Sequence, residues 1–191
     1  MAGKQAKILT DTQLWRLLTY ASTTLHPERD QVILLLSVKA GLRAGEIAHL
    51  TWDMVLDPSG EIGPVIELRD KAAKKRNGRL IPIHPDLYDA LGWWKARTLP
   101  QGPVVRSARG GHMHPVSIVN WFKKAYRAVG LVGCSSHSGR RTFITRAARL
   151  VHQAGGSLRD VQLLAGHRSI VTTQRYIDGD SDSQRRLVSL I

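Results

Sequence analysis

The main stretch with β character, residues 53–83, interrupts a chain whose other segments carry mostly helical signals. Within it, the apolar segments 65–68 and 80–83 have the composition of short strands. Asn77-Gly78 lies between them and is a strong signal for a chain reversal, which predicts a hairpin. One more short strand is predicted at Val104-Val105, within a glycine-rich loop. This distribution predicts an α+β fold that is mostly helical and has a small three-stranded antiparallel sheet.

Helix start and stop signals lie on both sides of that stretch. Thr10-Asp11-Thr12-Gln13 is the pattern of a capping box and opens a helix that extends to about residue 24. Pro27 suits the first turn of a second helix over residues 28–40, and Gly41 suits its end. Ser157 and Asp160 form another capping-box pattern, and Gly166 ends that helix. Further helices are predicted over residues 44–50, 85–98 and 115–129, from about residue 137, and over residues 170–177.

The charge of the chain is unusual for a globular protein. It has 28 Lys and Arg residues against 15 Asp and Glu residues, so its formal net charge is +13. Such a surplus favours a polyanionic partner, although a ribosomal or membrane-surface protein can carry the same charge. The longest apolar run, residues 32–36, is too short to span a bilayer, and no signal-peptide stretch follows residues 1–7. Cys134 is the only cysteine, which excludes an internal disulfide and a cysteine-based zinc site. We therefore expect a cytoplasmic protein that does not bind membranes.

Two arginines are placed to bind a phosphate. Arg43 lies between Gly41 and Gly45, where backbone can approach a ligand closely, and Arg140 ends His137-Ser138-Gly139-Arg140. Because arginine is always protonated and forks onto two oxygens, two arginines stabilise the charge that builds up when a phosphodiester is attacked. Taken alone, Arg43 is better explained as a surface arginine in a turn, and H-x-x-R occurs by chance in many helices. Residues 137–176, however, contain seven arginines and one acidic residue, which favours an anionic ligand.

Two histidines and a tyrosine supply groups for proton transfer and attack. His137 and Arg140 are three residues apart at a predicted helix start, so they share a face. His167 follows Gly166 and can bind a phosphate oxygen or relay a proton, but a capping or core role explains it equally well. Tyr176 is the candidate nucleophile, although an isolated tyrosine is usually half-buried on an amphipathic helix. Together these residues suit cutting and rejoining DNA through a phosphotyrosine link.

The predicted hairpin is strongly basic, and a lysine at its tip can reach the minor groove and protonate a departing 5′ oxygen. Its basic residues are Arg69, Lys71, Lys74, Lys75, Arg76 and Arg79. We expect contacts with DNA backbone phosphates from Lys71, Lys75, Arg76, Arg141 and Arg168. The sequence has no Walker loop, no G-x-G-x-x-G and no paired acidic motif for two metal ions. The predicted chemistry therefore uses no cofactor and no metal.

These motifs together resemble the catalytic domain of the tyrosine recombinases, the phage integrase and Xer family. Residues 40–50 are similar to the first arginine box of the family. The second box is matched by His137-Ser138-Gly139-Arg140, Leu164-Ala165-Gly166-His167 and residues 172–176. The hairpin lysine of the family typically lies eight positions before the proline of a strand such as Leu80-Ile81-Pro82, which points to Lys74 and leaves Lys71 and Lys75 as alternatives. The matching segments run from about residue 10 to residue 176.

The resemblance implies a site-specific recombinase with a 3′-phosphotyrosine intermediate. The implied roles are Tyr176 as nucleophile, Arg43, Arg140 and His167 as phosphate ligands, His137 as an aid to proton transfer, and Lys74 as general acid. The implied partners are double-stranded DNA with paired inverted sites, further copies of the chain in a dimer to tetramer, and accessory DNA-bending proteins. A type IB topoisomerase-like relaxing enzyme and a non-catalytic DNA-binding regulator on the same scaffold are the alternatives.

The resemblance also predicts how the chain is divided. Residues 1–180 are expected to form the catalytic domain, and residues 181–191 a C-terminal tail. The tail is expected to pack on a neighbouring protomer on DNA, or to fold back on its own protomer when the protein is free, and a frayed terminus is the alternative. Family members usually carry a separate core-binding domain ahead of the catalytic domain, and we expect none here. A natural single-domain recombinase and an excised catalytic domain both fit that arrangement.

Overall fold

The structure is a computed structural model that describes residues 6–70, 72, 78–176, 188–189 and 191. Its internal contacts divide it into two units, Met1–Phe143 and Ile144–Ile191. Several predicted features lie outside the described residues: Lys71, Lys74, Lys75, Arg76, Asn77, and the tail 181–191 except for residues 188, 189 and 191.

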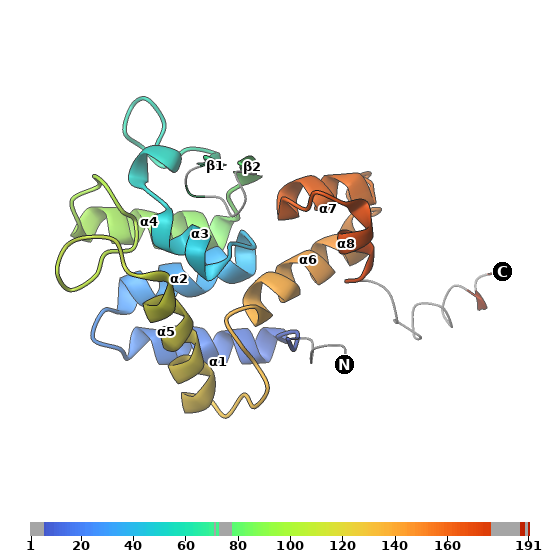
Figure 1. Cartoon of the computed structure of the whole chain (residues 1–191), viewed down its shortest axis with the longest axis horizontal. Helices are drawn as coiled ribbons and strands as arrows, with labels where there is room; N and C mark the ends of the chain where they lie inside the picture. The colour runs from blue at the N-terminus through green and yellow to red at the C-terminus, as the bar shows by residue number, and fades with distance from the viewer. Residues whose placement is uncertain (1–5, 71, 73–77, 177–187, 190) are drawn as a thin grey trace. The chain divides into compact units, whose positions relative to one another are not determined.

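Unit 1 is built around α2 (Pro27–Lys39), which lies between α1 (Asp11–Ser22) and α4 (Pro85–Arg97) (Figure 1). Val32, Ile33, Leu34 and Leu36 of α2 are completely buried. The longest apolar run of the sequence is therefore core. None of the helices in the described part of the chain combines the length and the apolar character that a bilayer crossing requires.

The predicted start of α1 is confirmed. Thr10 Oγ1 accepts from the Gln13 N–H (3.2 Å), and Gln13 Oε1 accepts from the Thr10 N–H (3.0 Å), which completes a capping box. α5 (Pro115–Ala128) packs against α1 and against the short α3 (Ala44–His49). Its buried face contains Phe122 and Tyr126. These contacts fix α3, whose first turn belongs to the candidate site.

The sheet is smaller than predicted, and the third strand was wrong. In the described residues it consists of β1 (Val65–Leu68) and β2 (Arg79–Pro82), which are antiparallel, with Leu68 opposite Arg79. Val104 and Val105 are completely buried but form no strand. The carbonyl oxygen of Val104 accepts from the Trp94 indole (2.8 Å), and its N–H donates to the Leu50 carbonyl (2.9 Å). The bond to Leu50 belongs to an isolated antiparallel bridge between Thr51 and Pro103, and among the described residues no further pair extends this bridge into a strand.

Unit 2 contains α7 (Leu158–Ala165) packed against α8 (Ile170–Gln174). α6 (Ser138–Leu150) begins in unit 1 and continues into unit 2. The predicted capping box of α7 is confirmed, and Gly166 ends the helix in the left-handed conformation with φ 61°. α8 ends at Gln174, three residues before the predicted end. Tyr176 therefore lies in the turn that follows α8 rather than within the helix.

Candidate active site

Two glycines allow the start of α6 to approach the end of α2 closely. A side chain on Gly139 would come within 2.4 Å of Ser37 Oγ. Gly41 has a positive φ of 65°, and a side chain there would come within 2.4 Å of the Phe143 ring. The sequence alone indicates a helix end at Gly41 and a motif position at Gly139. The structure shows that they also make room for the contact between α2 and α6.

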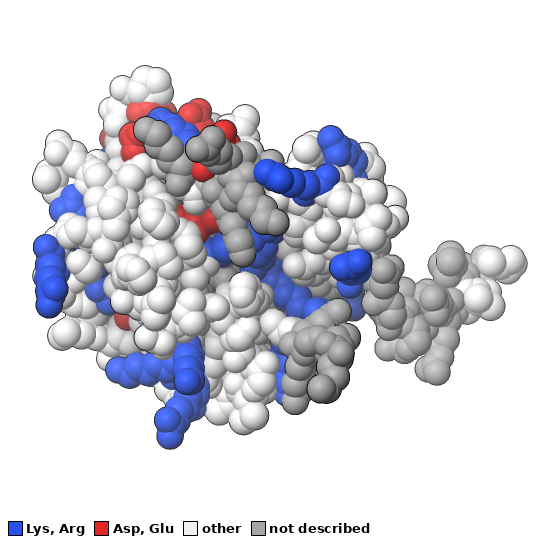
Figure 2. All heavy atoms as spheres, viewed as in Figure 1, with Lys and Arg blue, Asp and Glu red and all other residues white. Residues whose placement is uncertain are grey.

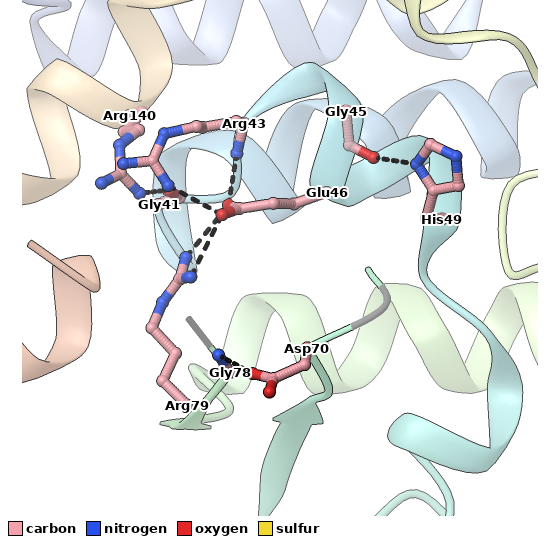
Figure 3. A network of polar contacts seen from close by, with 9 residues as sticks. All are labelled: Gly41, Arg43, Gly45, Glu46, His49, Asp70, Gly78, Arg79 and Arg140. Carbon is pink, nitrogen blue, oxygen red and sulfur yellow. Dashed lines mark hydrogen bonds and ion pairs between the residues drawn. The ribbon is translucent and has the colours of Figure 1, made fainter. Parts of the chain in front are cut away.

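This close approach positions Arg140. Its Nη1 donates to the Gly41 carbonyl at 2.6 Å, and the residue is 4% exposed. The acceptor of this hydrogen bond is a backbone carbonyl, which the fold holds in place. The bond therefore fixes the direction of the buried guanidinium. Arg140 therefore reaches the segment 41–46 that carries Arg43 (Figure 3).

Arg43 is held by Glu46, three residues further along the chain. Arg43 is the N-cap residue of α3, and its N–H donates to Glu46 Oε2 (2.9 Å). Its side-chain Nη1 donates to Glu46 Oε1 (2.7 Å). The Glu46 side chain is 1% exposed, whereas 24% of the Arg43 side chain is exposed. The buried carboxylate thus anchors a guanidinium that still faces solvent.

Arg79, the first residue of β2, binds the same carboxylate from the other side (Figure 3). Its Nη1 and Nη2 donate to Glu46 Oε1 and Oε2 at 3.1 and 3.0 Å, a two-pronged contact. Burial by itself raises the pKa of Glu46, but the hydrogen bonds and charges of Arg79 and then of Arg43 outweigh it and lower the pKa to about 2. Glu46 is therefore ionised throughout the physiological pH range.

In unit 2, His167 and Tyr176 lie together. Their rings are stacked with centroids 5.5 Å apart and an angle of 25° between the planes. His167 Nδ1 is 2.9 Å from Thr173 Oγ1, and the Tyr176 N–H donates to the Thr173 carbonyl (3.0 Å). Thr173 is completely buried and His167 is 9% exposed. One threonine thus positions both the imidazole and the backbone of the tyrosine.

Gln162 of α7 fixes the backbone of His167. Gln162 Nε2 donates to the His167 carbonyl (2.9 Å), and the His167 N–H donates to the Gln162 carbonyl (3.1 Å). Arg159 donates in turn to Gln162 Oε1 (2.8 Å). Gly166, which lies between Gln162 and His167, adopts the left-handed conformation and turns the chain back toward the end of α7. This turn brings the His167 backbone to Gln162.

The other predicted site residues are placed as follows. His137 is exposed and directly precedes α6, where its carbonyl accepts from the Arg141 N–H (2.9 Å). Arg141 is half-buried and Arg168 is exposed. Lys74, the predicted general acid, lies outside the described residues, as do Lys71, Lys75 and Arg76. Their roles stay predictions.

Tyr126 can be excluded as a substitute nucleophile. It is 2% exposed and stacks on Phe122 within the core. Burial, with the neighbouring Cys134, raises the pKa of its phenol far above the usual value. A group that is both inaccessible and hard to ionise cannot attack a DNA phosphate.

The pocket in the β1 region is not suited to DNA. It has a volume of about 780 Å³, and its lining includes Asp53, Asp57 and Glu67. Figure 2 shows acidic side chains gathered in one area of the visible face, while Lys and Arg side chains are dispersed over it. Carboxylates repel a phosphate backbone, so this pocket is poorly suited to hold one. Among the described residues, no group of three or more His, Cys, Asp and Glu side chains is arranged to hold a metal ion.

Three residues that hold these regions in place were not predicted as site residues from the sequence: Glu46, Arg79 and Thr173. Glu46 had a usable signal, because Arg43 and Glu46 have the spacing of an N-cap residue and its N3 partner. Arg79 had none, since its pairing with Glu46 depends on how β2 lies relative to α3. Thr173 is one of two adjacent threonines, and the sequence does not show which of them is buried.

Comparison with known proteins identifies the family of this chain. Residues 7–182 match the phage integrase family. This chain belongs to the phage integrase family. The resemblance seen in the sequence is thereby confirmed.

Among its relatives, the tyrosine recombinase XerC of Rhizobium meliloti (strain 1021) is 31% identical over 185 residues, covering 92% of this chain and 54% of that protein. The XerC of Brucella suis biovar 1 (strain 1330) is 32% identical over 158 residues, covering 80% and 47%. The chain thus spans about half the length of the curated relatives it matches.

Solved structures show the same fold. The XerA recombinase superposes with a TM-score of 0.75 at 22% identity, covering 96% of this chain and 64% of that one. A lambda integrase dimer bound to a COC′ core site gives a TM-score of 0.71 at 19% identity, covering 93% and 49%. The predicted α+β class is confirmed, apart from the third strand.

Proposed function

We propose that this chain is the catalytic part of a site-specific DNA recombinase that cleaves and rejoins DNA through a 3′-phosphotyrosine intermediate. Its membership of the phage integrase family and its XerC relatives support this function. The observation that carries the proposal is the ring contact of Tyr176 with His167, at 5.5 Å between centroids. A phenol held beside an imidazole is suited to nucleophilic attack, and a protein that only binds DNA has no need of it.

In the proposed reaction, Arg43, Arg140 and His167 hold the scissile phosphate. The Tyr176 oxygen loses its proton, with the aid of His137, and forms a bond to phosphorus while the bond to the 5′ oxygen breaks. Lys74 gives a proton to that leaving oxygen. The phosphotyrosine keeps the energy of the phosphodiester, so attack by a 5′-hydroxyl of another strand reverses the step and joins new partners.

The proposed partner is double-stranded DNA with paired inverted sites, bound by two to four copies of the chain. The net charge of +13 supports a polyanionic partner. Exposed Arg168 and half-buried Arg141 are proposed contacts with backbone phosphates, together with Lys71, Lys75 and Arg76. Accessory DNA-bending proteins and a location in the cytoplasm belong to the same proposal.

The test is the formation of a covalent protein–DNA complex. Nicked duplexes are tiled across the DNA that flanks the gene. A nick lets the short leaving fragment, which carries the free 5′-hydroxyl, diffuse away, and this traps the phosphotyrosine. We expect one duplex to give a band that survives denaturation and disappears after protease treatment. Binding without any covalent band would favour the non-catalytic regulator. Covalent bands on all duplexes, with plasmid relaxation and no joint products between two duplexes, would favour a topoisomerase.

The proposed general acid has a test of its own. A 5′-phosphorothiolate at the scissile position leaves without a proton, so it should restore cleavage to Lys74→Ala but not to Arg140→Ala. Rescue of Lys71→Ala or Lys75→Ala instead would assign the role to another lysine of the hairpin.

A further inference from the structure

The carboxylate of Glu46 serves two arginines at once. Oε1 accepts from the side chains of Arg43 (2.7 Å) and Arg79 (3.1 Å). Oε2 accepts from the Arg43 backbone N–H (2.9 Å) and the second prong of Arg79 (3.0 Å). Figure 3 shows the Arg43 guanidinium above the Glu46 carboxylate and the Arg79 guanidinium below it. Neither arginine can shift without changing the bonds of the carboxylate that holds the other.

We infer that Arg79 is a positioning residue for DNA cleavage, which acts through Glu46 to keep the Arg43 guanidinium fixed and electropositive for the scissile phosphate. The inference rests on the proposed function, because it concerns the same phosphate. Arg79 itself is buried, with 6% of its side chain exposed, whereas Arg43 has 24% exposed. Arg43 is therefore the arginine that offers its charge to a ligand, and Arg79 is the one behind it.

The charges explain why a second arginine is needed. A buried glutamate paired with Arg43 alone would neutralise it and compete with the phosphate for its N–H groups. With Arg79 present, one negative charge is shared between two positive charges, so the cluster of Arg43, Glu46 and Arg79 keeps a net positive charge. Arg79 also offsets most of the cost of burying the carboxylate, through two charge-assisted hydrogen bonds. Glu46 can then orient the Arg43 guanidinium without neutralising its positive charge.

The position of Arg79 adds a structural link. It is the first residue of β2 and pairs with Leu68 of β1. Just before it, the Gly78 N–H donates to the Asp70 carboxylate (2.8 Å), which closes the base of the hairpin (Figure 3). The bond from Arg79 to Glu46 therefore ties the base of the basic hairpin to the first turn of α3.

The experiment measures covalent-complex formation on the nicked duplex that the unaltered protein cleaves. Arg79→Gln should slow cleavage about ten- to a hundredfold, because a misplaced Arg43 loses its alignment with the phosphate. The affinity for uncleaved duplex should change less than about threefold, since many phosphate contacts remain. Arg79→Lys keeps the charge but loses the fork, so it should restore part of the lost rate. If Arg79→Gln does not fold, as judged by circular dichroism, Arg79→Lys carries the test.

A second substrate separates positioning from a general loss of structure. A methyl group in place of one non-bridging oxygen of the scissile phosphate removes the charge that Arg43 has to stabilise. On this methylphosphonate duplex, the Arg79 variants should cleave within about threefold of the unaltered protein. Equal slowing on both substrates would mean that Arg79 only supports the fold, and the inference would be wrong.

Arg69→Gln is the matched control. Arg69 follows β1 on the other side of the same hairpin, pairs with Asp53, and has 53% of its side chain exposed. Arg69→Gln removes one positive charge, as Arg79→Gln does, but it leaves the contacts of Glu46 unchanged. Cleavage should therefore change less than about twofold. Full activity of Arg79→Gln, or an equal loss with Arg69→Gln, would overturn the inference while leaving the recombinase proposal intact. The absence of any covalent complex with the unaltered protein would overturn both.

Discussion

Two regions carry the predicted site residues, one in unit 1 and one in unit 2, and they are held by different forces. The arginine region, which comprises residues 41–46 with Arg79 and Arg140, is fixed by charge around one buried carboxylate. The histidine–tyrosine region, which comprises Gln162, His167, Thr173 and Tyr176, is fixed by uncharged hydrogen bonds and a ring contact. The first keeps the same charge over a wide pH range. The second contains a hydroxyl, Thr173 Oγ1, that can donate to or accept from the imidazole of His167.

This difference matches two chemical tasks. A phosphate ligand has to stay positive and rigid, because movement or neutralisation removes transition-state stabilisation. A tyrosine nucleophile has to lose its proton before it attacks, so its task involves a change of charge rather than a fixed charge. The following predictions test the contrast between charge and proton transfer, in order of decreasing effect.

The largest effect is expected from Tyr176→Phe. The variant keeps the aromatic ring that stacks on His167 and removes only the nucleophilic oxygen, so covalent complex formation should fall below detection while DNA binding is retained. A denaturing gel with the nicked duplex measures the first, and a gel shift measures the second. Tyr126→Phe serves as a test of the buried tyrosine and should retain cleavage. Covalent product from the Tyr176 variant would show that this region does not supply the nucleophile.

The arginines should show the next largest effect. Arg43→Ala and Arg140→Ala should each slow cleavage at least about a hundredfold, by analogy with losing one donor to a developing oxyanion. Arg140→Ala should also lower the free energy of unfolding by about 1–3 kcal/mol, because the Gly41 carbonyl loses a buried donor.

Single-turnover rates, binding titrations and urea unfolding of both arginine variants separate these effects. An equal loss of binding and cleavage would reduce the two residues to ordinary backbone contacts.

Acid should destabilise the arginine region, because it protonates the carboxylate of Glu46 that binds Arg43 and Arg79. The Glu46 pKa of about 2 in the folded protein lies below the ordinary value of 4.5, so its contribution is fully present above about pH 4.5 and is lost as the pH falls through about 2. The difference corresponds to about 3 kcal/mol of unfolding free energy. Urea unfolding between pH 2 and 7 should show a shallower acid dependence for Glu46→Gln than for the unaltered protein.

Glu67→Gln is the matched control, because Glu67 is an exposed glutamate on β1. It removes the same charge away from the two arginines and should leave the acid dependence close to that of the unaltered protein. Identical pH curves for Glu46→Gln and the unaltered protein would contradict the ionised pair.

The smallest effect should come from Thr173→Val, which removes the hydroxyl that meets His167 Nδ1 and keeps the shape of the side chain. We expect cleavage to slow about fivefold, which corresponds to about 1 kcal/mol for one uncharged hydrogen bond. The pH profile of cleavage should shift as well, because the imidazole loses a partner. Thr172→Val is the matched control on the exposed side of α8 and should have no effect on either. Equal behaviour of the two variants would mean that the contact between Thr173 and His167 has no role in cleavage.

Much of the site was predictable because it depends on local signals. Arg43, Arg140, His167 and Tyr176 lie in short motifs whose order along the chain is itself informative. Within each unit, the structure brings two of them into one region: Arg43 with Arg140, and His167 with Tyr176. Glu46, Arg79 and Thr173 were not predicted as site residues, since their contacts join segments whose pairing or burial the motifs do not specify.

The sequence by itself determined the helix boundaries that local chemistry controls. The capping residues Thr10 and Ser157 and the terminating Gly166 act within one turn of chain, so their effect does not depend on the rest of the fold. Only the tertiary structure decided that Val104 gives its carbonyl to an indole instead of a strand, that Tyr126 is core, and that Arg79 meets Glu46. Each of these depends on which distant groups are close enough to compete for a hydrogen bond or to exclude water. That competition is settled by packing between elements, which no spacing along the chain encodes.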